Sequence, residues 1–128
     1  MRYMTAGESH GPCLTAIVEG VPAGLRVSED QINQDLARRQ SGYGRGGRQT
    51  IERDRVSVTS GVRFGRTLGT PVALAVANRD WENWTERMAA FGEAPEGLVR
   101  EVTPRPGHAD LVGALKVDTD DCRDILER

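Results

Sequence analysis

Residues 5–22 read TAGESHGPCLTAIVEGVP, and this stretch decides how the chain begins to fold. Its first half is rich in glycine and polar residues, which is typical of a tight turn. Its second half, residues 13–19, is short, contains several β-branched residues and is closed by a glycine and a proline. This composition favours a β-strand over a helix, so the stretch predicts a turn that leads into a strand.

The turn contains Gly7-Glu8-Ser9-His10-Gly11, which fits the Gly-x-Ser-x-Gly pattern that holds a nucleophilic serine in one large class of hydrolases. That class needs several earlier strands and a helix directly after the serine. Six residues precede this pattern and a strand is expected after it, so the hydrolase interpretation is a weak match. The alternative is a glycine-rich turn between two strands, with its polar residues facing water.

Composition limits the class of protein. The 128 residues, 38% hydrophobic and 28% charged, match one globular domain with a modest core. No apolar run has the length of a membrane span or a secretory signal, so we expect a cytoplasmic protein. Cys13 and Cys122 do not form a CxxC pair, which favours idle or buried thiols over a disulfide or metal site. The net charge of -2 predicts no general attraction to nucleic acid or membrane.

A helix is predicted over residues 28–40, SEDQINQDLARRQ. Ser28 is a suitable N-cap, and Gln31 stands three residues later, as in a capping box. Ile32 and Leu36 share one face of this helix. Ser41 and the glycine after it are expected to end the helix.

Arginine is concentrated in residues 38–55, RRQSGYGRGGRQTIERDR. The glycines at 42–47 allow close approach of the backbone to a ligand, and guanidinium groups pair bidentately with phosphate and carboxylate. The segment therefore predicts a cradle for an anion. Two alternatives stay open: a solvated arginine face, and an RGG element of the kind found in RNA-binding tails, which is disfavoured because it occurs once in globular sequence.

Strands are predicted over residues 56–62 and 70–77, and the second is apolar enough for burial on both faces. Residues 78–97 predict an irregular insertion or a partner-contact loop. Trp81 and Trp84 in this insertion are expected to be packing anchors and not part of a cofactor site.

Residues 104–111, PRPGHADL, contain the second of two histidines, His108, before a predicted helix start at Asp110. Each histidine by itself fits an ordinary loop residue. Together, His10 and His108 both stand in glycine-containing loops, and imidazole suits proton transfer near neutrality. Two such groups beside an arginine cradle indicate an enzyme that acts on an anionic, phosphorylated small molecule.

Four segments, GESHGPCLTAIVEGVPAG, LARRQSGYGRGGRQTIERD, GVRFGRTLGTPVAL and RPGHADL, resemble in order and spacing the N-terminal portion of chorismate synthase, in the form typical of actinobacterial sequences. The resemblance spans residues 1–128 and favours His10 over Ser9 as the reactive residue, since the family uses no serine nucleophile. It differs at Gln40, Ser41 and Val117, which affects details of binding.

The resemblance implies a carbon-oxygen lyase that eliminates phosphate from 5-enolpyruvylshikimate 3-phosphate, by an anti 1,4-elimination, to give chorismate in the shikimate pathway. It implies reduced FMN as cofactor and NADPH as a reductant of the flavin in some members. His10 would protonate the departing phosphate, and His108 would serve the FMN. Ser9, Arg39, Arg45 and Arg48 would bind substrate, and Arg39 and Arg45 would also bind NADP.

For the fold, the resemblance implies an α+β layered sandwich of helices and antiparallel sheets, assembled as a homotetramer. Residues 1–128 would form the N-terminal portion of a single domain, inactive alone, because the next flavin-contacting motif opens at Glu127 and Arg128. The alternative is that the fragment forms a non-catalytic module that binds anions or a partner.

Overall fold

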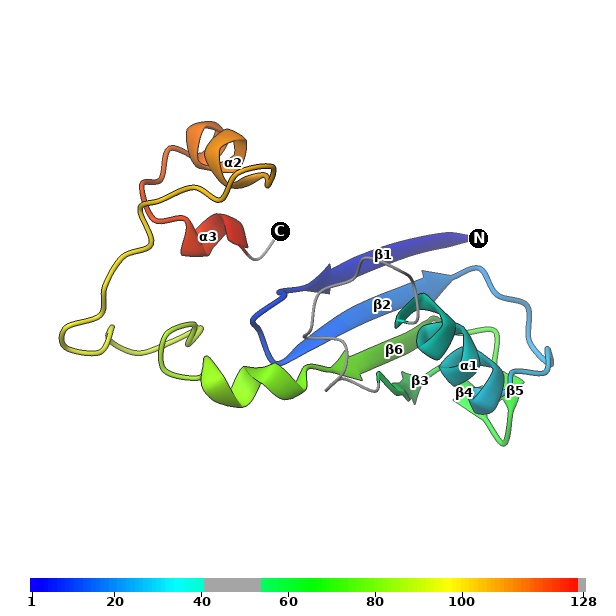
Figure 1. Ribbon diagram of the computed structural model, residues 1–128. Coiled ribbons are helices and arrows are strands. Elements are labelled where there is room, and N and C mark those ends of the chain that lie inside the picture. The colour runs from blue at the N-terminus through cyan, green and yellow to red at the C-terminus, as the bar shows by residue number, and fades with distance from the viewer. Residues whose placement is uncertain (41–53, 127–128) are drawn as a thin grey trace.

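A computed structural model describes residues 1–40 and 54–126 of the chain, which has the expected α+β fold. Within these residues, four strands form an antiparallel sheet in the order β1-β2-β6-β3, and β4 and β5 form a hairpin (Figure 1). The strands are β1 (Arg2–Gly7), β2 (Cys13–Glu19), β3 (Val56–Ser60), β4 (Val62–Arg63), β5 (Arg66–Thr67) and β6 (Val72–Ala77). The helices are α1 (Glu29–Gln40), the 3-10 helix η2 (Arg79–Asn83), α2 (Asp110–Val117) and α3 (Arg123–Leu126).

The opening stretch folds as predicted, with a turn between two strands. β1 pairs with β2 from Arg2 opposite Glu19 to Gly7 opposite Leu14. β2 covers the predicted residues, and no helix follows the turn, so the structure does not support a hydrolase-type nucleophile elbow.

The strand expected over residues 56–62 is divided at Gly61, where the prediction was wrong. Gly61 has a φ of +80°, and a Cβ added there would lie 2.5 Å from the carbonyl oxygen of Pro71. The chain therefore bends, and Val62 begins the hairpin. The turn of this hairpin has positive φ at Phe64 and Gly65, as a tight β-hairpin requires.

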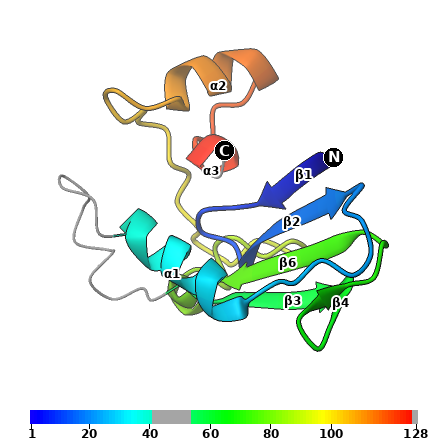
Figure 2. The ribbon, with the colours of Figure 1, turned by 90° about the vertical axis from the view of Figure 1, so that its right-hand side faces the viewer.

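The expectation for residues 70–77 is corrected in extent and burial. β6 begins at Val72, and within this strand Val72 is buried, Ala77 is exposed and the residues between them are half-buried. The physical reason is that the sheet is antiparallel and α1 lies across one of its faces (Figures 1 and 2), so β6 is not enclosed on both sides.

The helix α1 begins as its sequence predicts. The amide of Gln31 donates to the Ser28 hydroxyl oxygen at 3.3 Å, which satisfies one of the open amides of the first turn. In the first half of the helix, Asn33 accepts a hydrogen bond at 2.8 Å from the Val56 amide through its side-chain oxygen, which ties α1 to the start of β3.

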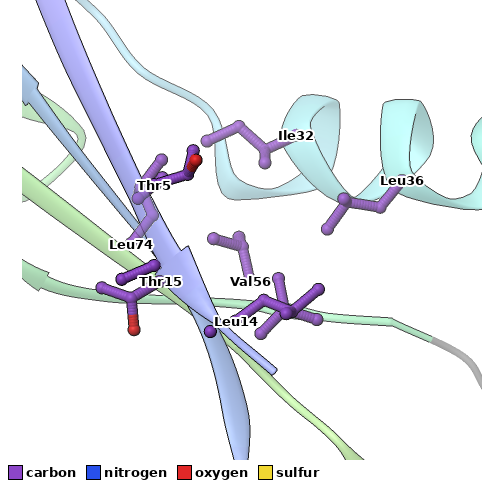
Figure 3. Close-up of a pocket in the computed structure, with 11 residues that line it drawn as sticks. Thr5, Leu14, Thr15, Ile32, Leu36, Val56 and Leu74 are labelled. Carbon is purple, nitrogen blue, oxygen red and sulfur yellow. The ribbon is translucent and has the colours of Figure 1, made fainter. Parts of the chain in front are cut away.

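An apolar cavity of about 470 Å³ lies between α1 and the sheet. Ile32 and Leu36 point from α1 toward the strands, as their shared face predicts, and Leu14, Val56 and Leu74 line the opposite side (Figure 3). The helix therefore faces the sheet without filling the space between them.

The C-terminal segment, residues 110–126 with α2 and α3, lies apart from the sheet (Figure 1). Residues 78–97 are irregular as predicted, apart from η2. The predicted helix start at Asp110 is confirmed, and α2 and α3 pack so closely that a Cβ at Gly113 would lie 2.4 Å from Ile125 Cγ2. Both cysteines are free thiols, Cys122 buried and Cys13 half-buried. Across the described ranges, no helix is long and apolar enough to span a membrane.

Candidate functional site

The turn between β1 and β2 carries the first candidate group, His10. The Gly11 amide donates to the Glu8 carbonyl at 3.1 Å, which closes the turn. Before it, Gly7 has a φ of +141°, and a Cβ there would lie 2.8 Å from the Cys13 carbonyl oxygen. A side chain cannot be accommodated at Gly7, so the glycine is needed to bring β1 into the turn.

His10 is half-buried, and its ring lies close to the side chains of Ser9 and Trp84. Its Nδ1 lies 3.0 Å from the Ser9 hydroxyl, and its ring centroid lies 4.2 Å from that of Trp84, with the planes tilted by 60°. Trp84 was expected to be a packing anchor. It packs, but what it packs against is the candidate catalytic imidazole.

His108 stands in the second candidate loop, just before α2. Its side chain is exposed, with Nδ1 3.1 Å from the Pro106 carbonyl oxygen, and its amide donates to the Arg105 carbonyl at 3.3 Å. Gly107, with a φ of +72°, allows the turn between them. These contacts shape the loop so that the imidazole faces outward.

An ion pair between the exposed Arg105 and the buried Asp110 closes the base of this loop. The backbone amide and Nε of Arg105 both donate to Asp110 Oδ2, at 2.8 and 2.9 Å, and an Nη of Arg105 donates to Oδ1 at 3.0 Å. Asp110 is 1% exposed. Hydrogen bonding from Arg105 lowers the pKa of Asp110 to about 2, so this carboxylate is ionised at neutral pH.

The arginine cradle is only partly described. Arg45 and Arg48, with the glycines around them, lie outside the described residues. Arg39 is at the end of α1, with its side chain 54% exposed and its guanidinium 3.6 Å from Asp54, whose side chain is 13% exposed. Arg39 is thus tethered to the chain just before β3 and keeps surface to offer a ligand.

Strand register brings several of these groups to one end of the sheet. Gly7 pairs with Leu14, Leu14 with Val76, and Val76 with Val56, so these four residues form a row across all four strands. The His10 turn follows the first of them, η2 follows β6, and the Arg39–Asp54 pair precedes β3. Figure 1 shows the C-terminal segment beyond this same end. His10 and His108 have different partners in the described contacts: Ser9 and Trp84 for one, Arg105 and Pro106 for the other.

Asn78 is a site residue that sequence reasoning missed. Its side-chain nitrogen donates to the carbonyl oxygens of Ser9 at 3.0 Å and Gly11 at 2.8 Å, so it holds the backbone on both sides of His10. An asparagine before a helical turn is a recognisable N-cap signal. Nothing in the sequence indicates that the same side chain reaches the first turn.

The described residues contain no cluster of three or more histidine, cysteine or carboxylate side chains that could hold a metal ion. The groups that they do present are an imidazole beside a hydroxyl, an exposed second imidazole and an arginine. This set can exchange protons and bind anions.

Known proteins resemble this chain over its whole length. The family model of chorismate synthase matches residues 1–128. Chorismate synthases of Geotalea uraniireducens (strain Rf4) and Aquifex aeolicus (strain VF5) are 61% and 59% identical to it, over 99% and 100% of the chain. The matched region is 32% of each relative, so the chain spans about a third of the length of these curated proteins.

A solved structure agrees with these matches. The protein described as "Crystal Structure of Chorismate Synthase" superposes with a TM-score of 0.68 at 44% identity, over 99% of this chain and 28% of the other. Similarity of sequence and fold over the full 128 residues leads to one conclusion. The chain belongs to the chorismate synthase family.

Proposed function

We propose that this chain supplies the N-terminal part of an enzyme that eliminates phosphate from 5-enolpyruvylshikimate 3-phosphate to form chorismate, a lyase reaction of the shikimate pathway. The observation that carries the proposal is that one end of the sheet carries both the His10 turn and the start of β3, next to which Arg39 pairs with Asp54. Removal of a phosphate dianion needs an acid and a cationic group at one site, because the leaving oxygen gains negative charge as its bond to carbon breaks.

His10 is the proton donor to the departing phosphate in this proposal. The Ser9 hydroxyl, 3.0 Å from Nδ1, orients the ring and can contact the substrate or relay a proton. The proton leaves a ring nitrogen of His10 for a phosphate oxygen while the carbon-oxygen bond breaks. His10 is then reprotonated before the next turnover.

In this proposal, arginine side chains bind the substrate. Arg39, together with Arg45 and Arg48 outside the described residues, pairs with the phosphate and carboxylate groups of the substrate. Arg39 and Arg45 also serve NADP, if NADPH reduces the flavin of this protein.

Reduced FMN is the proposed cofactor, and His108 is the described residue that best fits it. The imidazole is exposed on a loop whose base is fixed by the Arg105–Asp110 pair, so one ring nitrogen can face a flavin while Nδ1 faces Pro106. When bound, reduced FMN would supply the transient electron transfer that the elimination needs. The role of His108 is to keep the correct protonation beside it.

We further propose a cytoplasmic homotetramer in which residues 1–128 are the N-terminal portion of a single domain. Residues 1–128 alone are then inactive. Purified 1–128 with reduced FMN and the substrate should yield no chorismate, whereas the complete gene product that contains this chain should.

The test of the chemistry is His10→Ala in the complete gene product under anaerobic conditions. General acid catalysis contributes typically a hundred- to ten-thousand-fold, so kcat should fall by roughly that factor while the substrate dissociation constant changes little. His108→Ala should also slow turnover and should alter the pH dependence of the absorbance of the bound reduced flavin. Turnover at the parent rate in both variants would show that the two histidines are ordinary loop residues with no catalytic role.

A further inference from the structure

The segment that follows β6, residues 78–84, packs against the turn that carries His10. We use the term η2 clamp for Asn78, Asp80 and Trp84, which bracket and include part of η2. Figure 1 shows this segment continuing from β6 at the end of the sheet where the chain passes from β1 to β2. The clamp and the turn are adjacent because Cys13 of β2 pairs with Ala77 of β6.

Asn78 fixes the backbone of the turn. Its side-chain amide donates to Ser9 and Gly11, and its own backbone amide donates to the Pro12 carbonyl at 2.9 Å. The side-chain amide nitrogen of Asn78 carries two hydrogens, and the bonds to Ser9 and Gly11 use both of them. Aspartate has the same shape but would place a charged acceptor against two carbonyl oxygens.

Asp80 and Trp84 fix the ring of His10. The Asp80 amide donates to Asn78 Oδ1 at 3.1 Å, and the Trp84 indole donates to Asp80 Oδ2 at 3.0 Å. This orients the indole whose centroid lies 4.2 Å from that of His10. On the indole also lies the guanidinium of Arg87, 5.3 Å from the ring centroid and bonded to Glu101 at 2.8 Å.

We infer that the η2 clamp positions His10 for proton transfer, with Asn78 and Trp84 as positioning residues that do not touch the substrate. The inference rests on the proposed function, because it gives His10 a proton to deliver. Residues 1–9 are exposed along the whole of β1 and into the turn, so the hydrogen bonds from Asn78 are made at the edge of the molecule and not in a packed core. A general acid must be held within hydrogen-bond reach of its target, and a 1 Å displacement can cost about a hundredfold in rate.

The experiment compares four variants of the complete gene product: Asn78→Asp, Trp84→Leu, Trp84→Phe and the control Trp81→Phe. Trp81 belongs to η2 and enters the described hydrogen bonds through its backbone, so it is a matched indole in the same segment. Trp84→Leu and Asn78→Asp should lower kcat by roughly ten- to a hundred-fold with the substrate dissociation constant within about twofold of the parent. Trp84→Phe keeps an aromatic ring against His10 and should restore most of the rate.

Two further readouts separate positioning from general stability. In a His10→Ala background, Trp84→Leu should cause no additional loss of kcat, because the ring that it positions is already gone. By NMR, the imidazole resonances of His10 should carry a ring-current shift that disappears in Trp84→Leu and persists in Trp81→Phe.

The outcomes distinguish this inference from the proposed function. A parent protein without turnover would refute the function, and the ring-current shift would still decide whether the clamp holds His10. Full additivity of Trp84→Leu with His10→Ala, or His10 resonances unchanged in Trp84→Leu, would overturn the inference. If Asn78→Asp does not fold, the Trp84 variants and the NMR spectrum still decide it.

Discussion

Asp110 combines burial with a negative charge, and Arg105 makes that combination stable. A carboxylate at 1% exposure would normally favour its neutral form. Three hydrogen bonds from the backbone and guanidinium of Arg105 reverse this preference. The loop that carries His108 therefore depends on one residue remaining ionised.

This predicts a specific acid sensitivity. The pKa of Asp110 is about 2 in the folded chain against an ordinary value of 3.8, so its contribution to stability is present above pH 4 and is lost as the pH falls toward 2. Urea unfolding midpoints measured from pH 5 to pH 2 should fall less in Asp110→Asn than in the parent. Asp121, whose pKa Arg123 also lowers to about 2, adds to the fall in both proteins. Glu96→Gln, at an exposed loop carboxylate, should match the parent, and an identical slope in Asp110→Asn would contradict the prediction.

Arg39 and Arg38 are neighbours on α1 in different surroundings. Arg39 pairs with Asp54 near the sheet, whereas Arg38 pairs with Asp35 on the same helix and its side chain is 80% exposed. If Arg39 binds substrate, a charge-assisted bond of about 1.5–3 kcal/mol is lost in Arg39→Ala. The substrate dissociation constant, measured by calorimetry on the complete gene product, should then rise about ten- to a hundred-fold. Arg38→Ala should stay near the parent value, and an unchanged dissociation constant in Arg39→Ala as well would assign both arginines to the solvated face.

At the scale of elements, Gly61 is the hinge between β3 and β4. Its positive φ would strain any side chain, and the Pro71 carbonyl oxygen would lie 2.5 Å from an added Cβ, whereas Gly97 has a similar φ of +77° and nothing within 4 Å of an added Cβ. An alanine at Gly97 would therefore introduce backbone strain alone, whereas an alanine at Gly61 would introduce both backbone strain and steric overlap.

Alanine at these positions should have unequal costs. Gly97→Ala should lower the free energy of unfolding by about 1–2 kcal/mol from strain alone. Gly61→Ala adds overpacking of typically 1–3 kcal/mol, so its total loss should be roughly 2–5 kcal/mol. Chemical denaturation of both variants checks the difference, and equal losses would mean that Val72 and Pro71 move aside freely.

The elements that the sequence predicts well are those fixed by local chemistry. Ser28 caps α1 and Asp110 opens α2 because capping and first-turn charge depend on residues within one turn. The break at Gly61 was missed because the close approach of Pro71 and Val72 to this glycine arises only when the chain folds back on itself. Asn78 was missed for the same reason, since it meets Ser9 at a separation of 69 residues. The half-buried state of β6 follows from which faces of the sheet are covered, and that is a property of the assembled fold.

At the scale of the molecule, the described residues expose much apolar surface. Leu111, Val112 and Leu115 of α2 are 56%, 71% and 76% exposed, and an apolar cavity of about 470 Å³ lies under α1. A chain that spans a third of its relatives is expected to leave such surface uncovered.

Residues 1–128 alone should therefore bind the dye ANS and self-associate. Replacing Val112 and Leu115 together by serine should reduce ANS fluorescence at unchanged helix content by circular dichroism. The complete gene product should bind less dye per chain. Dye binding unaffected by the serines would mean that α2 is not the main exposed surface.

The hydrogen bonds between Asn78 and the His10 turn also determine when, during synthesis of the chain, this turn can be completed. At a synthesis rate of about 5–20 residues per second, the 69 residues between Ser9 and Asn78 take roughly 3–14 seconds to be made. Until then β2 lacks its partner β6, and closure of so long a loop is entropically costly. The His10 turn is thus among the first parts of the chain to leave the ribosome, yet it reaches its working shape only after β6 and Asn78 have followed.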